Sequence, residues 1–367
     1  MSSTSQRAGR RPEPYMPDIG RAVVKPRLQG KGTVINLSLN ESSFGASPRA
    51  VAAAQERCER LNRYPDVAST ELRQAIGAHF GLEPDRIVCG NGSEELLDVI
   101  ARLYARPGDE ILFTEFGFIQ FPIVTMRVGA TAVKAAAPNQ TSDVDALLAC
   151  ITERTRIIYL DNPNNPCGTY ISAEAVKRLR DGVPSHIVLV IDSAYADFVD
   201  GRDYTDGIEL VEGFENVIVT RTFSKAWGLA ALRVGWAYTS LSMARVMNRM
   251  RGIGNVNAIA QATVLAALKD PDFVRFVREK TAAERARMAE ALTKLGLSVT
   301  PSVTNFLMVK FPSDTNHRAS AALAHLAEHG IIVRGAEDYG LPDSLRITIG
   351  DASENDKVLA ALRSFMV

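Results

Sequence analysis

A single lysine interrupts the largely apolar stretch TFSKAWGLAALRVGW at residues 222–236. An amine in such surroundings is either a surface residue whose stem lies along the protein, or a buried group with a lowered pKa. A lysine of the second kind can attack a carbonyl carbon and then carry protons. Lys225 is therefore the first candidate for chemistry, and its neighbours must decide between the two interpretations.

Five short apolar runs precede the polar residues that would accompany this lysine. They are RIVCG at 86–90, EILF at 110–113, RIIYL at 156–160, IVLVI at 187–191 and NVIVT at 216–220. Their continuous hydrophobicity predicts strands buried on both faces, as in a mostly parallel sheet covered by helices. Ligands of such α/β sheets bind beyond the carboxyl ends of the strands. We therefore expect the residues that follow the five runs to meet at one crevice.

The turn GNGSEELL at 90–97 combines flexible glycines with the start of a helix. Ser93 would cap this helix in any case, but free backbone N–H groups at this point also suit a phosphate. The turn has neither the glycine spacing of a dinucleotide fingerprint nor the lysine of a P-loop, so a small cofactor with one phosphate fits better than NAD or ATP. Arg233 could alternatively lie at an exposed helix position. We expect the phosphate site to be completed by Thr222, Ser224 and Arg233.

Asp192 follows five apolar residues at the end of a predicted strand. Burial of a carboxylate is costly unless it meets a cation or several donors, and a protonated pyridine nitrogen would be a suitable partner. Tyr195 and Asn165 would each reach a phenolic oxygen of the same ring, and Phe118 would stack on it. Lys225 would then form a Schiff base with the cofactor aldehyde. A turn cap for the aspartate and core packing for the phenylalanine are the structural alternatives.

Several motifs, in this order and spacing, resemble the fold-type-I aminotransferases that use pyridoxal 5'-phosphate (PLP), and among them the histidinol-phosphate aminotransferase branch. The similarity extends from about residue 13 to the C-terminus. The motifs are EPYMPDIG (13–20), LSLNESSFGASP (37–48), RYPD (63–66), GNGSEELL (90–97), DNPNNPCG (161–168), VIDSAYADF (190–198), RTFSKAWGLAALRVGW (221–236) and LRITIG (345–350). The resemblance implies the PLP-dependent transferase fold type I, an α/β fold whose large domain has a mostly parallel sheet covered by helices.

We predict three parts of the chain. Residues 1–36 are an N-terminal arm that packs on the small domain or on a dimer partner, residues 37–250 are the large PLP-binding domain, and residues 251–367 are a smaller α+β C-terminal domain. The last part contains the helical pattern FVREKTAAERARMAEALTKLG at 276–296, followed by segments typical of strands and one helix.

Carried over residue by residue, the resemblance assigns the site. Lys225, Asp192 and Tyr195 are the catalytic residues. The cofactor-binding residues are Gly92, Ser93, Glu94 (through its backbone), Phe118, Asn165, Asp192, Tyr195, Thr222, Ser224, Lys225 and Arg233, with Tyr64 from the neighbouring subunit of a homodimer that shares its active sites. The substrate-binding residues are Tyr15, Asn40, Arg334 and Arg346. A guanidinium binds a carboxylate or a phosphate equally well, so the last of these does not identify the substrate.

The implied reaction is transfer of an amino group from histidinol phosphate, or from an aromatic amino acid, to 2-oxoglutarate. A PLP-dependent lyase, such as an L-threonine O-3-phosphate decarboxylase, is the alternative within the fold. A non-catalytic binding protein of this fold would be expected to lose Lys225 or Asp192, and both are present. The sequence departs from the family pattern at Asp18, Ile19, Ser42, Ser43, Cys167, Ile253 and Gly254. These changes concentrate in segments that face the amino donor, so they bear on the substrate rather than on the cofactor.

Composition excludes other classes of protein. The chain has 42 Lys and Arg against 42 Asp and Glu, which leaves no net charge to attract nucleic acid or a membrane surface. The four cysteines are scattered, and no signal-peptide core or membrane span is apparent. We expect a cytoplasmic enzyme that acts on small molecules. No metal site is expected, because the helical pair His325 and His329 is typical of a solvated face.

Overall fold

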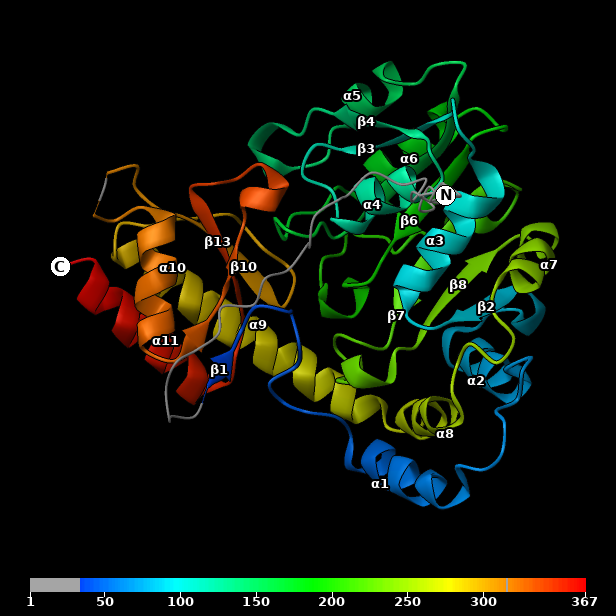
Figure 1. The fold of residues 1–367 in the computed structure, drawn as a ribbon, viewed down its shortest axis with the longest axis horizontal. Helices are drawn as coiled ribbons and strands as arrows, with labels where there is room; N and C mark the ends of the chain where they lie inside the picture. The colour runs from blue at the N-terminus through cyan, green and yellow to red at the C-terminus, as the bar shows by residue number, and fades with distance from the viewer. Residues whose placement is uncertain (1–33, 315) are drawn as a thin grey trace, which may run out of the picture.

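The structure is a computed structural model that describes residues 34–314 and 316–367. A seven-stranded sheet forms the centre of its larger part (Figure 1). The strands, in spatial order, are β2 (Ile87–Gly90), β8 (Gly235–Thr239), β7 (Val217–Thr222), β6 (Val188–Asp192), β5 (Thr155–Asp161), β3 (Glu110–Thr114) and β4 (Thr131–Ala135). The two pairings of β8 are antiparallel and the other four are parallel. The mostly parallel sheet and its five predicted strands are therefore present.

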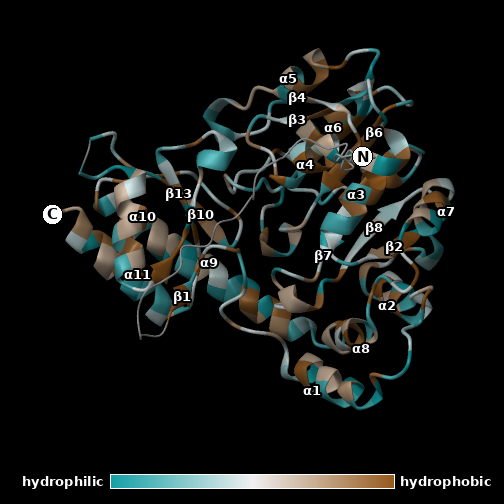
Figure 2. Cartoon of the chain, in the orientation of Figure 1, coloured by the Kyte–Doolittle hydropathy of each residue, from teal (hydrophilic) through white to brown (hydrophobic). Residues whose placement is uncertain are grey.

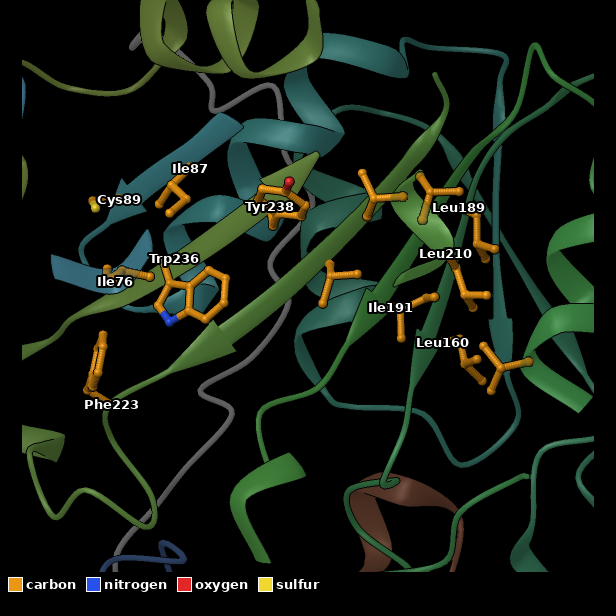
Figure 3. Packing of buried hydrophobic residues seen from close by; sticks show 14 of the residues in the cluster. Ile76, Ile87, Cys89, Leu160, Leu189, Ile191, Leu210, Phe223, Trp236 and Tyr238 are labelled. Atoms are coloured by element: carbon orange, nitrogen blue, oxygen red, sulfur yellow. The ribbon is translucent and has the colours of Figure 1, made fainter. Parts of the chain in front are cut away.

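Helices cover both faces of this sheet. Successive strand residues point to opposite sides, and because both sets are apolar, both faces must be buried. In β5, Ile158 and Leu160 belong to one core cluster, and Ile157 and Tyr159 belong to another. Helices α5 (Val144–Ala149), α6 (Ala173–Gly182) and α8 (Ala258–Ala267) contribute to the first cluster, part of which Figure 3 shows around Leu160 and Ile191. Helices α3 (Ser93–Tyr104), α4 (Gln120–Arg127) and α7 (Leu241–Met250) contribute to the second.

The remaining helices follow the same amphipathic pattern. Figure 2 shows hydrophobic and hydrophilic residues on different sides of helices such as α3 and α11. The helices not yet described are α1 (Pro48–Arg57), α2 (Thr70–Phe80), α9 (Pro271–Lys294), α10 (Ala319–Glu328) and α11 (Ala352–Phe365). Short 3₁₀ helices occur at Cys58–Arg60, Pro84–Arg86, Pro138–Gln140, Ala196–Phe198, Ile208–Val211, Ala230–Leu232 and Glu337–Tyr339. Within the described ranges, no helix has both the length and the apolar character that a membrane crossing requires.

The C-terminal part has its own antiparallel sheet and core (Figure 1). The sheet contains β12 (Arg334–Gly335), β13 (Ser344–Thr348), β10 (Phe306–Lys310) and β9 (Ser298–Val299), in that order. Strand β1 (Ile35–Asn36) pairs in parallel with β11 (Ile331–Ile332), so the chain enters the described structure on this smaller part. Residues 1–33 of the predicted arm lie outside the described residues. The predicted division of the chain into three parts stays a prediction.

Segment 37–40 joins the two parts of the chain. The backbone N–H of Thr348 donates to the carbonyl oxygen of Leu37, and Arg346 Nη2 donates to that of Ser38 at 2.9 Å. The next two residues contact the larger part, where Leu39 accepts a hydrogen bond from Lys225 and Asn40 donates one to Tyr195. The segment therefore places β13 close to the carboxyl ends of β6 and β7.

Candidate active site

A cavity of about 510 Å³ lies where the carboxyl ends of β5, β6 and β7 face β12 and β13. Most of the residues that the sequence singled out line it, although they come from distant segments. They are Asn40, Ser93, Glu94, Phe118, Asn165, Asp192, Tyr195, Thr222, Ser224, Lys225, Arg233, Arg334 and Arg346. The predicted convergence at the strand ends is thus observed in the structure.

Lys225 follows β7 and points its amine into this cavity. Its Nζ donates to the carbonyl oxygen of Leu39 at 3.2 Å and lies 5.8 Å from the centroid of the Tyr195 ring. Burial lowers the pKa of Lys225 to about 8, and the nearby guanidinium groups of Arg346 and Arg233 act in the same direction. At neutral pH the amine is thus mostly charged but roughly a tenth of it is uncharged, far more than for an ordinary lysine, which suits a nucleophile. Its burial excludes the surface interpretation.

Asp192 ends β6 and is 4% exposed. Its Oδ1 accepts a hydrogen bond from Thr220 Oγ1 on the adjacent strand β7 at 3.0 Å. Burial raises the pKa of Asp192 to about 6, while the bond from Thr220 and the charge of Lys225 oppose the rise. The carboxyl group is mainly ionised at neutral pH in a site that excludes most water, so it favours a cationic partner.

The amino end of α3 forms an anion-binding corner with Arg233. Arg233 Nη1 donates to Ser224 Oγ at 3.2 Å, and its Nη2 lies 3.7 Å from Glu94 Oε2. Gly92, the N-cap of α3, has a φ of 82°, and a Cβ there would lie 2.6 Å from Arg233 Nη2. Only glycine therefore lets the guanidinium approach the helix start, where backbone N–H groups and the helix dipole favour an anion. Thr222 Oγ1 supports the corner by accepting a hydrogen bond from the Ser224 N–H at 3.1 Å.

Two arginines lie opposite each other on neighbouring strands at the other side of the cavity. Arg334 of β12 and Arg346 of β13 are register partners. Arg346 Nη1 donates to Asn165 Oδ1, and Arg334 Nη2 donates to Asp338 Oδ2 at 3.4 Å. The Nε atom of each arginine is buried without a hydrogen-bond partner among residues 34–314 and 316–367. Two neighbouring guanidinium groups that each keep an unpaired N–H suit an anionic ligand.

Tyr195 and Asn165 have fixed orientations at the edge of the cavity. Asn40 Nδ2 donates to Tyr195 Oη at 2.8 Å, and Thr348 Oγ1 donates to Asn40 Oδ1 at 3.2 Å. Burial raises the pKa of Tyr195, so its hydroxyl stays protonated and can donate a hydrogen bond. The Asn165 backbone N–H donates to Asp161 Oδ2 at 2.9 Å. Both side chains can therefore present polar groups to one ligand.

Two predicted residues of the described part of the chain, Tyr64 and Gly92, do not line this cavity. Tyr64 is 94% exposed and lines a separate surface depression with Leu61, Gly254 and Asn257. Its predicted contact requires a second subunit, so one chain does not test it. Tyr15 lies outside the described residues. Gly92 shapes the cavity as the N-cap of α3 without lining it.

Nine residues that line the cavity were not predicted from the sequence, namely Leu39, Glu41, Ile119, Asp161, Pro163, Ala194, Ala230, Ala231 and Tyr339. Asp161 carries the same signal as Asp192, because it is an acid directly after an apolar strand. The same reasoning could therefore have predicted Asp161 as a cavity residue. Tyr339, whose hydroxyl accepts a long hydrogen bond of 3.5 Å from Arg346 Nη1, follows no motif and belongs to a 3₁₀ helix in the C-terminal part.

The site combines a buried amine, a buried acid at a strand end and an anion-binding helix start. This combination is typical of aminotransferases, and the comparison with known families identifies the same class. The family model for aminotransferase class I and II matches residues 32–362, and the chain belongs to this family. The predicted family, the predicted fold class and the prediction of an aminotransferase are confirmed.

Within the family, the chain is similar to proteins described as histidinol-phosphate aminotransferases. It is 48% identical to the one from Rhodopseudomonas palustris (strain BisA53), over 96% of this chain and 95% of the relative. It is 47% identical to that of Paramagnetospirillum magneticum, over 92% of this chain and 93% of the relative. The crystal structure of the Sinorhizobium meliloti histidinol-phosphate aminotransferase in complex with pyridoxal-5'-phosphate has a TM-score of 0.86 and 31% identity, and covers 91% of this chain and 90% of its own.

Proposed function

We propose that this aminotransferase uses PLP to move an amino group from histidinol phosphate to 2-oxoglutarate. The observation that carries the proposal is the placement around one cavity of a reactive amine and two guanidinium groups, each with an unpaired Nε–H among the described residues. The amine supplies the chemistry, and the guanidinium groups select an anionic substrate.

The residues of the cavity fit PLP. Ser93, Ser224 and Arg233 would hold its phosphate, Asp192 would pair with its ring nitrogen, and Lys225 is placed for its aldehyde. When bound, PLP withdraws electrons from the α carbon of the amino donor through its protonated ring. The glycine at position 92 supports this assignment, since a side chain there would close the phosphate corner.

The chain's own groups control the protons of the reaction. With its lowered pKa, the Lys225 amine can take up a proton at Nζ and release it again at neutral pH. Asp192 is mainly ionised at neutral pH and would hold a positive charge on the ring nitrogen of PLP. Tyr195, held by Asn40, keeps its hydroxyl directed into the cavity as a hydrogen-bond donor.

The arginine pair favours a phosphorylated donor. A phosphate carries about two negative charges near neutral pH and offers three terminal oxygens, so it can use two guanidinium groups at once, whereas a carboxylate is satisfied by one. Arg334 and Arg346 are adjacent across two strands, and each has an unused Nε donor. This arrangement supports histidinol phosphate over aromatic amino acids as the donor.

A donor panel tests the proposal. Purified enzyme with PLP and 2-oxoglutarate is given histidinol phosphate, histidinol, phenylalanine, tyrosine or threonine phosphate, and glutamate is measured. Histidinol is the matched control because it lacks only the phosphate. Two charge-assisted contacts of about 1.5 kcal/mol each predict a kcat/KM roughly 100-fold higher for histidinol phosphate. Equal rates with both would contradict the role of the arginine pair, and CO₂ release from threonine phosphate without glutamate would favour the lyase.

We also infer that two copies of the chain form a homodimer through the surface around Tyr64. Tyr64 is 94% exposed, Ile253 is 93% exposed and Leu61 is 70% exposed, and a depression of about 660 Å³ lies beside them. Large apolar side chains grouped on one face favour a protein interface. In such a dimer Tyr64 would contribute to the cofactor site of the partner subunit.

Complementation between two inactive variants tests the shared site. Lys225→Ala and Tyr64→Ala are each expected to be impaired as pure proteins, but mixed dimers contain one intact site. With random pairing, a co-expressed equal mixture is expected to regain about a quarter of wild-type activity, as two-fold symmetry requires. Activity equal to the sum of the separate variants, or a monomer in sedimentation experiments, would rule out the shared site.

We infer a cytoplasmic location from the thiols. Cys58, Cys89, Cys150 and Cys167 are all free in the structure. Unpaired cysteines are typical of proteins in a reducing compartment.

A further inference from the structure

Two buried acids, rather than one, stand at the strand ends below the cavity. Asp161 ends β5 and Asp192 ends β6, and the two are register partners on these parallel strands. Each is 4% exposed and each lines the cavity. Register partners on a sheet point to the same side, so the two carboxyl groups share one dry environment.

Asp161 also fixes the loop that follows β5. Asn164 Nδ2 lies 3.1 Å from both carboxylate oxygens of Asp161, and the Asn165 N–H donates to Oδ2 at 2.9 Å. Asn164 Nδ2 in turn lies 3.1 Å from the carbonyl oxygen of Phe116, two residues before Phe118. A single carboxyl group therefore connects two of the segments that line the cavity.

The charges around the pair determine how it holds protons. Like charges in a low-dielectric site disfavour double ionisation. Burial raises the pKa of Asp161 to about 7, and the charge of Asp192 adds to the rise. Burial raises the pKa of Asp192 less, to about 6, because the hydrogen bond from the Thr220 hydroxyl and the positive charge of Lys225 stabilise its ionised form. Asp161 thus takes up the first proton as the pH falls, and Asp192 takes up a proton at a lower pH.

The other groups that face the pair do not change this order. Cys167, in the loop after β5, is a buried thiol whose pKa is raised by burial and by Asp161, so it stays neutral. Tyr195 is neutral as well, because burial raises its pKa. Arg346 of β13 donates to the Asn165 side chain rather than to either acid. The two carboxyl groups therefore titrate chiefly against each other and Lys225.

We propose that Asp161 is a positioning residue of the cofactor site, which holds Asn165 in place and adds a second negative charge beside Asp192 when it is ionised. The proposal rests on the proposed function, because the group that would feel this charge is the protonated ring nitrogen of PLP. The extra charge would strengthen binding of that cation only above the pH at which Asp161 loses its proton. A purely structural role would have the same effect at every pH.

The test is the dissociation constant of PLP for the apoenzyme, measured by equilibrium dialysis at about pH 5.5 and about pH 8.5, on either side of the pKa of about 7. Asp161→Asn is isosteric and uncharged. It is expected to match wild type at the lower pH and to bind PLP roughly tenfold more weakly at the higher pH, since tenfold corresponds to one pKa unit of interaction. Asp161→Ser, which serves if the amide variant is unstable, removes both the charge and the contacts to Asn164 and Asn165. It is expected to bind PLP more weakly at both pH values and to show the further loss at the higher pH. Asp161→Glu is expected to restore binding at the higher pH.

Asp109→Asn is the matched control, because Asp109 is a buried acid at the opposite, amino-terminal edge of the same sheet. It should bind PLP as wild type does at both pH values. Weakening of Asp161→Asn by the same factor at both pH values, or no weakening at either, would overturn the proposal while leaving the aminotransferase function intact. Failure of the wild type to bind PLP would instead overturn the proposed function.

Discussion

Replacing Lys225 with alanine should abolish amino transfer and remove the visible absorbance that a Schiff base between Lys225 and PLP would give. The loss is expected to be about 10⁴-fold or more, because one side chain supplies both the nucleophile and the proton carrier of the reaction. Folding should be unaffected, since the Lys225 amine makes a single hydrogen bond within residues 34–314 and 316–367, to a backbone carbonyl. Absorbance in the visible range and glutamate formation are measured together.

Lys177→Ala is a suitable control for this variant. Lys177 is exposed on α6 and pairs with Asp181 at 2.7 Å, far from the cavity lining. Its removal should change neither the colour nor the rate. A yellow and active Lys225→Ala protein would show that another amine carries the chemistry and would refute the assignment.

Replacing Asp192 with asparagine should lower kcat by about 10²–10³-fold. Removing one partner of a buried ion pair costs about 3–5 kcal/mol, and each 1.4 kcal/mol corresponds to about tenfold in rate. The amide keeps the size of the side chain and can still accept the hydrogen bond from Thr220, but it cannot hold a positive charge on the cofactor ring. Steady-state kinetics with the preferred donor, and the thermal melting temperature, separate this effect from a loss of folding.

Asp192→Glu provides the complementary variant because it keeps the charge and shifts its position. Partial recovery of kcat relative to Asp192→Asn is expected. If the asparagine variant retains full activity, the acid at the end of β6 is not the partner of the ring nitrogen. If both variants melt at much lower temperatures than wild type, the role of Asp192 is chiefly structural.

The sequence was sufficient to predict the central strands, because each is a continuous apolar run buried on both faces. Strand β4 (Thr131–Ala135) escaped this reasoning since it lies at the edge of the sheet and three of its five residues are exposed. Strand β8 (Gly235–Thr239) begins in the last two residues of the motif at 221–236, whose residues predict chemistry rather than a strand. Its antiparallel direction does not follow from the sequence, because the segment 223–234 between β7 and β8 is long enough for a parallel crossover.

The same distinction applies to the site. Asp192 and Lys225 were predictable because they directly follow strands, and parallel strands bring their carboxyl ends together. Glu41 and Tyr339 line the cavity from segments outside the strands of either sheet, where neither periodicity nor strand order predicts a position. Tyr64 is a separate case, because its predicted partner belongs to another chain.

The hydrogen bonds of segment 37–40 couple two side chains that belong to different parts of the chain. Ser38 and Leu39 are consecutive, and their carbonyl oxygens accept from Arg346 and Lys225 respectively. The trans peptide unit keeps neighbouring α carbons about 3.8 Å apart. A movement of the C-terminal part that carried Ser38 along with Arg346 would therefore also displace the hydrogen-bond acceptor of Lys225.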